Sequence, residues 1–438
     1  MKKNYLKFTG PNLWKRAKKI IPGGSMLFSK KSEMFLYKNW PSYFSKSKKC
    51  YVWDLHDKKF LDMIFAVGAC TLGYSNPKID NFVIKKIIKG NMTTLNAPEE
   101  VYLAEKLIEI HPWAKMVKFA RTGGEANSIA VRIARAASGK DGVAFCGYHG
   151  WHDWYLSSNI KTNNSLNDHL MNGLEIAGVP KVLKNTTFPF LYNDIHMLKK
   201  IIRENKIGVI KMEVKRNLEP QNNFLQKVRE LATRNNIVLI FDECTSGFRE
   251  TYGGIHKKYD VNPDIAMFGK AIGNGYALTA VIGKKEVMSA AQKTFISSTF
   301  WTERVGSVAA LQTIKLMKEI SSWKIITEIG KKVIKGWKDL SSRYNIDITI
   351  TGSTGIPSFI FSSEKHIVFK TYLTKKMLSK GILASNIIYI SVAHTPSILK
   401  LYFYELEKVF YDLSKYDFNY IKNQVKHDLC TSDFKRIN

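Results

Sequence analysis

Short apolar runs alternate with helical segments through the middle of the chain, and this alternation limits the fold more than any other feature. The runs have the length and composition of buried strands, at residues 115–119, 142–146, 207–212, 237–241 and 264–268. Residues 125–137 and 225–235 have the apolar spacing of helices. Strands separated by helices pair in parallel through right-handed crossovers. We therefore expect an α/β domain with a mainly parallel central sheet flanked by helices.

The two ends of the chain have a different pattern. Residues 12–21 predict a helix, and a hairpin is expected with its turn at His56-Asp57. The C-terminal part mixes strands, at 347–350, 358–361 and 387–391, with helices, at 368–380 and 397–413. The expected divisions are an arm with a hairpin, a large domain, and a linking helix with a smaller α+β part, at residues 1–75, 76–310 and 311–438.

Composition excludes several classes of protein. Hydrophobic residues make up 45% of the 438 residues, enough for a substantial core. No apolar run approaches the roughly 20 residues of a membrane span, and the basic N-terminus lacks the apolar segment of a signal peptide. The five cysteines show no CxxC spacing, which predicts reduced thiols in the cytoplasm and no metal site.

The formal net charge of +30 is spread along the chain in short groups. A lysine-rich composition explains this spread best, and attraction to anionic substrates is the next interpretation. No nucleic-acid-binding motif is present, so we expect no nucleic-acid partner and no membrane partner.

Lys270 follows an apolar strand and opens a glycine-rich loop at residues 267–275. The small neighbours leave room for a bulky planar ligand to reach its amine. Such a lysine suits covalent catalysis through a Schiff base. Taken alone, the segment is better explained by a surface lysine in a turn, and the other segments of the chain reverse this preference.

A second loop of small residues precedes the helix that starts at Glu125. Thr122, Gly123 and Gly124 leave backbone N–H groups free at a helix N-terminus, which is a site for an anion such as phosphate. The alternative is an ordinary junction with Thr122 as the helix cap.

A third loop follows the strand at 142–146. Tyr148 lies between Gly147 and His149 and could stack on a flat ligand. His149 and His152 are three residues apart, as in some metal sites, but the glycines around them argue against a helix that would hold both histidines in register.

The strand at 237–241 ends in two carboxylates, Asp242 and Glu243. A buried strand does not carry carboxylates without partners, and ligands of open α/β sheets bind at the carboxyl ends of the strands. Asp242 could pair with a cationic nitrogen there, or could serve as a helix cap or in a salt bridge.

Pyridoxal phosphate explains these four segments together. It needs a phosphate cradle, a stacking aromatic, a carboxylate for its ring nitrogen and a lysine, and the chain has them in that order. Asp242 would keep the ring nitrogen protonated, and Lys270 would bond to the cofactor and later move a proton.

In this order the segments resemble the class III aminotransferases of fold type I, and within them the glutamate-1-semialdehyde aminomutase branch. The motifs that carry the resemblance are Thr122-Gly123-Gly124-Glu125-Ala126, Tyr148-His149-Gly150, residues 242–249 and residues 263–270. The resemblance covers about residues 10–410. It implies a large domain that binds the cofactor and a smaller domain built from both ends of the chain.

The resemblance also implies roles for individual residues. Gly123 and Gly124, with Thr122, would bind the phosphate. Tyr148 and Cys244 would lie on opposite faces of the ring, and His149 and Glu213 belong to the same cofactor site. Thr299 would reach the phosphate of a neighbouring subunit, so a homodimer with a shared active site is implied.

The chain departs from the aminomutase pattern on the substrate side. Lys30 lies in the segment 25–31, where that branch has an arginine for the substrate carboxylate, and a lysine cannot supply the same bidentate contact. Arg216 and Arg304 lie in segments where the family favours other residues. These three cations are the candidate substrate contacts.

The expected activity is therefore that of a pyridoxal-phosphate aminotransferase. It would transfer an amino group from an amino acid, glutamate by preference, to a carbonyl compound, as in relatives from surface-polysaccharide or specialised-metabolite pathways. The alternative is glutamate-1-semialdehyde 2,1-aminomutase, which moves the amino group within one molecule of the tetrapyrrole pathway.

Overall fold

The computed structural model describes residues 9–160, 177–362 and 364–431. The chain divides into two compact units. Unit 1 combines residues up to Asn76 with those from Ile325 onward, and unit 2 runs from Pro77 to Lys324. Among the helices of the described residues, none is both long and apolar enough to cross a lipid bilayer.

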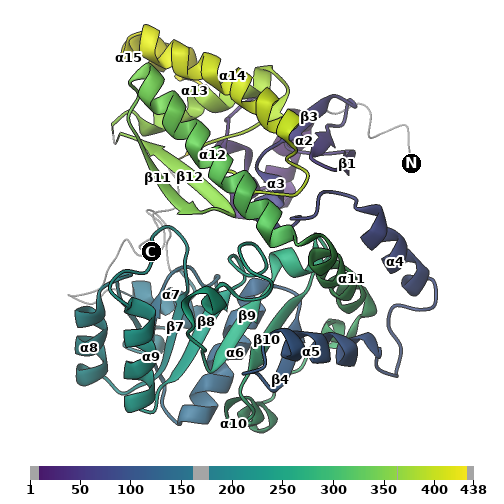
Figure 1. The fold of residues 1–438 in the computed structure, drawn as a ribbon, viewed down its shortest axis with the longest axis vertical. Coiled ribbons are helices and arrows are strands. Elements are labelled where there is room, and N and C mark those ends of the chain that lie inside the picture. Colours follow the sequence, from purple (N-terminus) through teal and green to yellow (C-terminus); the bar gives the residue numbers. More distant parts are fainter. Residues whose placement is uncertain (1–8, 161–176, 363, 432–438) are drawn as a thin grey trace. The chain divides into compact units, whose positions relative to one another are not determined.

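A seven-stranded sheet forms the centre of unit 2 (Figure 1). Its strands lie in the order β4 (Met116–Ala120), β10 (Thr279–Gly283), β9 (Ile265–Phe268), β8 (Val238–Glu243), β7 (Ile207–Glu213), β5 (Gly142–Cys146) and β6 (Thr187–Pro189). Strand β10 is antiparallel to β4 and β9, whereas the other neighbours pair in parallel. The expected α/β fold with a mainly parallel sheet is confirmed.

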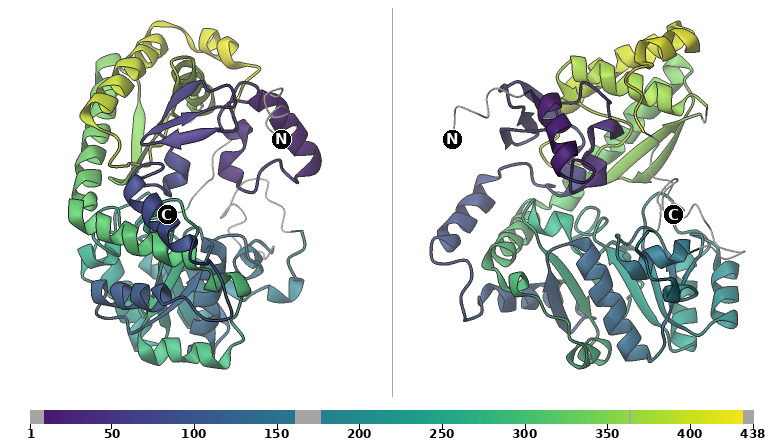
Figure 2. Two further views of the ribbon diagram at one scale, coloured as in Figure 1. Left: turned by 90° about the vertical axis from the view of Figure 1, so that its right-hand side faces the viewer. Right: turned by 180° about the vertical axis from the view of Figure 1, so that it is seen from behind.

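Helices cover both faces of this sheet (Figure 2). On one face, α6 (Gly123–Ser138) and α10 (Lys285–Met288) pack over Val209, Ile240 and Met267. On the other face, α8 (Ile195–Glu204) and α9 (Phe224–Arg234) pack over Ile210, Leu239 and Phe241. Both faces of β7 and β8 are therefore buried, which explains why these strands are apolar almost throughout.

A further group of helices in unit 2 packs beside the sheet. Helix α11 (Arg304–Ile320) contacts α4 (Pro77–Ile87) and α5 (Glu99–Ile110). The short helix α7 (Asp153–Leu156) follows β5.

Unit 1 combines a small mixed sheet with helices around its own core. The sheet has the order β1 (Lys46–Lys48), β2 (Tyr51–Trp53), β3 (Lys59–Asp62) and β13 (Ile382–Leu383). A separate hairpin pairs β11 (Ile348–Ser353) with β12 (Ile356–Phe361). The helices of this unit are α2 (Gly10–Ile20), α13 (His366–Ser379), α14 (Pro396–Lys415) and α15 (Phe418–Val425), and α12 (Ser322–Tyr344) enters it from unit 2.

One expected strand of unit 1, at residues 387–391, is wrong. This segment makes a single bridge from Ile387 to Ser358 of β12 and no continuous ladder. The backbone N–H groups of Ile388 and Ile390 donate to the carbonyls of Pro357 and Gly355 (3.0 and 3.1 Å), but Pro357 has no N–H with which to complete the pairing. The apolar run is still buried, because Ile388 and Ile390 belong to the core of unit 1.

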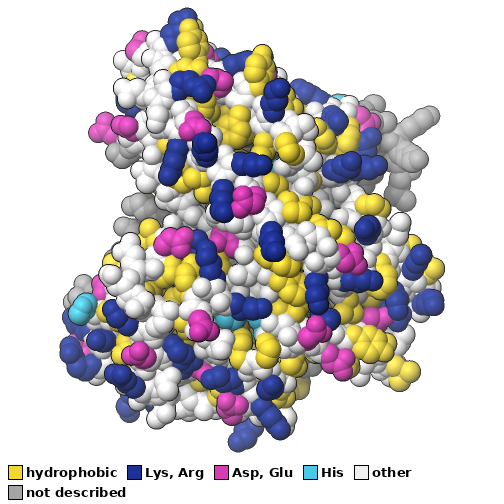
Figure 3. All heavy atoms as spheres, in the orientation of Figure 1, with side chains coloured by type: hydrophobic (Ala, Val, Ile, Leu, Met, Phe, Trp, Pro, Cys, Tyr) yellow, Lys and Arg dark blue, Asp and Glu magenta, His cyan; other side chains and the backbone are white. Residues whose placement is uncertain are grey.

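Basic side chains are scattered over the face of the molecule that Figure 3 shows, and do not gather there in one patch. On the face in Figure 3, lysines and arginines are interleaved with acidic and apolar side chains. This distribution agrees with a composition bias as the cause of the high net charge.

Candidate active site

The ladders of the large sheet bring the loops that follow its parallel strands to one edge. Glu213 of β7 pairs with Asp242 of β8, and Glu243 of β8 pairs with Phe268 of β9. Cys146, the last residue of β5, pairs with Met212. These pairings place the loops after β5, β7, β8 and β9 side by side. The end of β4 joins the same edge through β10, because Thr279 pairs with Ala120.

Lys270 is the first residue of a short 3₁₀ helix directly after β9. Its φ of +43° is in the left-handed region, which is unfavourable for a residue with a Cβ atom. Its Nζ donates to Thr245 Oγ1 at 2.5 Å, so the loop after β8 holds the amine. A strained backbone and a fixed side chain both mark Lys270 as a positioned group.

Asp242 lies buried at the end of β8 with both carboxylate oxygens engaged. Oδ2 accepts from His149 Nδ1 (2.9 Å), and Oδ1 accepts from the Cys244 backbone N–H (3.1 Å). Burial by itself would raise the pKa of this carboxyl, but the Lys211 ammonium and the His149 hydrogen bond outweigh burial and hold the pKa well below its ordinary value. Each ionised oxygen has a second acceptor position, so Asp242 can still accept from a ligand N–H.

His149 and Glu213 hold the loop that carries Tyr148. Burial and the nearby Lys211 lower the pKa of His149, whose Nδ1 lies 2.9 Å from Asp242 Oδ2 and whose Nε2 lies 3.1 Å from the carbonyl oxygen of Cys146. Glu213 Oε2 accepts from the backbone N–H of Tyr148 (3.1 Å). The Tyr148 side chain is 41% exposed, which leaves its ring accessible.

The N-terminus of α6 is open as an anion site requires. Thr122 and Glu125 form a capping box in which each side chain accepts from the other residue's backbone N–H. This arrangement uses the N–H groups of Thr122 and Glu125. A Cβ atom built on Gly123 would meet nothing within 4 Å, so there is space above the first turn.

Two further polar side chains, those of Trp151 and His152, lie against Gly124 at the N-terminus of α6. A Cβ atom there would lie 3.0 Å from His152 Nε2 and 3.2 Å from Trp151 Nε1. His152 Nε2 is buried without a hydrogen-bond partner among the described residues. An unpartnered nitrogen at the N-terminus of a helix fits a site whose phosphate would supply the missing acceptor or donor.

Cys244 has the character that a contact with a flat ring requires. Burial raises the pKa of its thiol well above the ordinary value, and Asp242 raises it further, so the thiol is neutral. Its Sγ lies 3.4 Å from the position of a Cβ atom on Gly269, next to Lys270. The residue therefore packs as a small apolar group rather than a nucleophile.

Thr299 begins a 3₁₀ turn (Thr299–Thr302) whose side chains are largely exposed. This turn is fixed to the base of α6, because Arg121 donates to the Trp301 carbonyl (2.8 Å) and Trp301 Nε1 donates to Glu125 (3.1 Å). The exposed side chain of Thr299 is therefore carried by a turn that hydrogen bonds hold in place.

The three candidate substrate cations lie in different surroundings. Arg304 is paired with the buried Glu99 through two hydrogen bonds of 2.9 and 3.2 Å. Arg216 is buried just after β7, in unit 2. Lys30 is in unit 1, in a short 3₁₀ helix at Phe28–Lys30. Arg304 has its charge compensated by Glu99, and Arg216 lies three residues after Glu213, the last residue of β7.

Sequence reasoning missed several residues of this edge. Thr245 holds Lys270, and Lys211 lies 3.7 Å from Asp242. Lys211 had a visible signal, because it is a charged residue inside the apolar run 207–212. In the sequence, His152 is notable only for its spacing from His149, which is that of some metal ligands.

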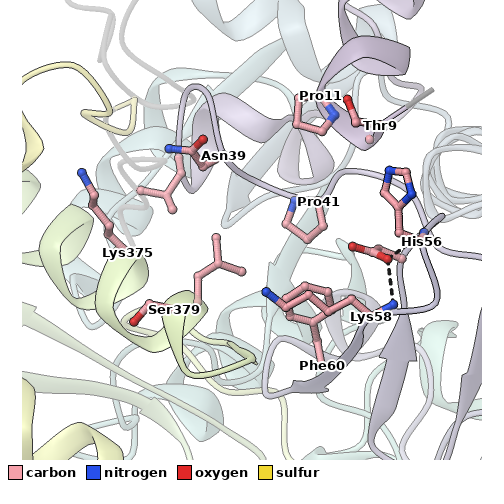
Figure 4. Close-up of a pocket in the computed structure, with 13 residues that line it drawn as sticks. Thr9, Pro11, Asn39, Pro41, His56, Lys58, Phe60, Lys375 and Ser379 are labelled. Carbon is pink, nitrogen blue, oxygen red and sulfur yellow. Dashed lines mark hydrogen bonds between the residues drawn. The ribbon is translucent and has the colours of Figure 1, made fainter. Parts of the chain in front are cut away.

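A separate cavity lies wholly within unit 1 (Figure 4). Its volume is about 350 Å³, and Asn39, His56, Lys58 and Lys375 line it. Asp54 accepts from the backbone N–H groups of His56 and Lys58, the Lys58 ammonium lies over the Phe60 ring (5.2 Å to its centroid), and Lys375 binds Asp428. The cavity contains none of the cofactor-site or substrate-site residues predicted from the sequence.

The residues at the sheet edge fit pyridoxal phosphate. They provide an open helix N-terminus for a phosphate, an ionised buried carboxylate for a ring nitrogen, a neutral thiol and an accessible aromatic for the ring, and a positioned lysine. All of these groups belong to unit 2.

Comparison with known proteins agrees with this arrangement. The model of the family "Aminotransferase class-III" matches residues 36–397. The chain is 33% identical to a 3-aminobutyryl-CoA aminotransferase of Cloacimonas acidaminovorans, over 83% of this chain and 86% of that protein. It is 32% identical to a glutamate-1-semialdehyde 2,1-aminomutase of Nitrosopumilus maritimus, over 88% of this chain and 95% of that protein.

Two solved structures share the fold. The FumI protein of Sphingopyxis sp. MTA144 has a TM-score of 0.84 at 22% identity, covering 93% of this chain and 98% of that chain. A glutamate-1-semialdehyde aminomutase of Pseudomonas aeruginosa PAO1 has a TM-score of 0.81 at 15% identity, covering 92% and 94%. With the family match and the identity of its relatives, the chain belongs to the class III aminotransferases, enzymes of fold type I that depend on pyridoxal phosphate.

Proposed function

We propose that this enzyme transfers an amino group from an amino acid, with glutamate as the preferred donor, to a small carbonyl compound. The observation that carries the proposal is the meeting of Lys270, Asp242 and the α6 N-terminus at one sheet edge, in a chain whose substrate-side segments differ from the aminomutase pattern. A relative named as an aminotransferase supports intermolecular transfer.

The proposed roles follow from the contacts of each residue. Pyridoxal phosphate, when bound, supplies an aldehyde that combines with amines and a ring that accepts electrons. The N–H groups of Gly123 and Gly124 would hold its phosphate, and Asp242 would accept a hydrogen bond from its ring nitrogen. Tyr148 and Cys244 would lie on the two faces of the ring. His149 and Glu213 position Asp242 and Tyr148.

Lys270 is the proposed catalytic base. Its amine would remove the proton from the substrate carbon that carries the amino group, and would return a proton in the second half of the reaction. Thr245 holds the amine within hydrogen-bond distance and so limits the positions from which it acts.

Arg216 is the proposed contact for an anionic group of the carbonyl substrate. It is buried in the unit that contains Lys270, and its guanidinium suits a carboxylate or phosphate. Arg304, which pairs with Glu99, is the other arginine candidate. Lys30 remains a candidate from unit 1. An acceptor from surface-polysaccharide or specialised-metabolite synthesis would have such an anionic group.

We also propose a homodimer. Phe295 and Phe300 are 94% and 69% exposed on either side of Thr299. Further exposed apolar side chains lie on and between α4 and α5: Ile84, Ile88, Met92, Leu95 and Val101. Clusters of this kind mark protein interfaces. Light scattering should give a dimer, and Phe300→Asp should weaken both the dimer and cofactor binding if Thr299 completes a neighbouring site.

Half-reactions test the proposed activity. Glutamate added to the cofactor-loaded enzyme should release one equivalent of 2-oxoglutarate and change the visible absorption of the cofactor. Lys270→Ala should abolish both effects, whereas Lys227→Ala, at an exposed position on α9, should leave them intact.

The second candidate function is glutamate-1-semialdehyde 2,1-aminomutase, because several relatives carry that name. Turnover of glutamate-1-semialdehyde without any external amino donor, together with no release of 2-oxoglutarate from glutamate, would replace our first proposal by this one.

A further inference from the structure

Lys211 is the most deeply buried lysine of the described residues, with a side chain that is 0% exposed. It lies in the middle of β7, between Ile210 and Met212. Its Nζ is 3.7 Å from Asp242 Oδ2 and 3.1 Å from Met267 Sδ. The only full charge within ion-pair distance of this ammonium, among the described residues, is therefore Asp242.

The ladder explains why Lys211 reaches Asp242. Glu213 is paired with Asp242, and Lys211 is two residues earlier on the same face of β7. Its long side chain runs along the sheet under α6, in a layer that otherwise contains Val209, Ile240 and Met267. An apolar residue would fill this place without the free-energy cost of burying a charge.

The other titratable groups around Lys211 are few. His149 faces Asp242 from the loop after β5, Glu213 lies on β7 itself, and Cys244 follows β8. Burial lowers the pKa of Lys211, while Asp242, Cys244 and Glu213 act in the opposite direction. Lys211 also contributes to the lowered pKa of Asp242.

We propose that Lys211 is a positioning residue that substitutes for the cofactor's ring nitrogen when the cofactor is absent. In the cofactor-free protein its ammonium neutralises Asp242 and keeps that carboxylate ionised and in place. When a protonated ring nitrogen takes Asp242 as its partner, Lys211 releases its proton to solvent, so that one cation remains beside Asp242. This inference rests on the proposed function, in which Asp242 faces the ring nitrogen.

If the Lys211 ammonium and the ring nitrogen compete for Asp242, the removal of Lys211 has effects that are not expected for a lysine with a purely structural role. Removing Lys211 should destabilise the cofactor-free protein, because the buried Asp242 loses its counter-charge. It should destabilise the loaded protein less, because the ring nitrogen replaces that charge. Pyridoxal phosphate should therefore bind Lys211→Met more tightly than wild type, by about tenfold, which is within the usual range for coupled sites.

The experiment compares wild type and Lys211→Met in cofactor-free and loaded form. Thermal unfolding gives the stability of each form, and calorimetry in buffers of different ionisation heat gives the affinity and the protons exchanged. Wild type should release about one more proton per cofactor bound than the variant. The 1-deaza analogue of pyridoxal phosphate, which has carbon in place of the ring nitrogen, should show no tightening in the variant.

Two controls make the comparison specific. Lys118→Met removes a partly buried lysine from β4 of the same sheet and should change neither affinity nor proton release. If Lys211→Met does not fold, Lys211→Gln gives the same comparison without the charge.

Equal destabilisation of both forms, with affinity and proton release unchanged, would overturn the proposal and leave Lys211 a structural residue. Failure of the underlying function has a different result. If Asp242→Asn binds pyridoxal phosphate and the 1-deaza analogue with equal affinity, and binds pyridoxal phosphate as tightly as wild type does, Asp242 does not face the ring nitrogen.

Discussion

Glu243 is the residue whose replacement should affect stability most directly. It is fully buried at the end of β8, and four donors surround its carboxylate. Oε1 accepts from His256 Nδ1 (2.6 Å) and from the His256 backbone N–H (3.0 Å). Oε2 accepts from the Ile255 backbone N–H (2.5 Å) and from Ser246 Oγ (3.2 Å).

Glu243→Gln keeps the shape of this side chain but replaces one acceptor oxygen by an NH₂ group. In either orientation the new amide faces a backbone N–H. His256 cannot relieve the conflict by changing tautomer, because its Nε2 already accepts from Trp113 Nε1 (3.1 Å). At least two donors lose their partners, and each buried polar group without a partner costs about 1–3 kcal/mol. The free energy of unfolding should fall by about 3–5 kcal/mol.

Denaturant unfolding of the cofactor-free protein measures this change as a lower midpoint at constant slope. Glu204→Gln is the matched control, because Glu204 is half-exposed and lies 3.7 Å from Arg203, and its effect should stay within about 0.5 kcal/mol. A loss below about 1 kcal/mol for Glu243→Gln would refute the argument, since it would mean that the four donors find other acceptors.

Three further predictions concern the phosphate cradle, pH and the catalytic lysine. Gly123→Ala should leave the melting temperature of the cofactor-free protein unchanged, because a Cβ there meets nothing within 4 Å, but should weaken pyridoxal phosphate binding by about tenfold or more if the phosphate fills that space. Burial, together with His256, lowers the pKa of His111 from 6.5 to about 4. Between pH 6.5 and about 4 the unfolded chain therefore binds a proton at His111 that the folded protein does not bind, so the free energy of unfolding falls as the pH is lowered through this range. His111→Gln should reduce this fall by up to about 3 kcal/mol, which denaturant unfolding at several pH values would measure. Thr245→Val should slow the glutamate half-reaction by about tenfold without changing cofactor affinity, and an equal rate in stopped-flow absorbance would show that Lys270 needs no such support.

The parts of the fold that sequence predicted share a physical cause. Strands β5, β7 and β8 are buried on both faces, so their apolar runs are nearly continuous and easy to recognise. The segment at 387–391 has the same composition, but it lies opposite Pro357 of β12, which has no N–H to donate to a ladder. That outcome depends on the residue opposite the segment and could not be read from apolar periodicity.

The site was predictable where a polar residue broke an apolar pattern. Asp242 was identified in this way, and its partner His149 was placed in the same cofactor site by family resemblance. Lys211 gives the same signal, but its meaning depends on the pairing of β7 with β8, which the sequence does not specify. Arg304 shows the opposite case, since its pairing with Glu99 brings together residues far apart in the chain.

The two adjacent carboxylates of β8 have separate roles because a strand directs successive side chains to opposite faces. Asp242 points to the α6 face, where His149 and Lys211 keep it ionised. Glu243 points to the other face, where His256 and the backbone fix the loop that carries Cys244 and Thr245. Substitution of Glu243 should therefore change stability in both cofactor states equally, whereas substitution of Asp242 should change chiefly the affinity for the cofactor. A variant of Glu243 that alters affinity without altering stability would show that the two faces of β8 are coupled, and that the loop after β8 is not held independently of the ring site.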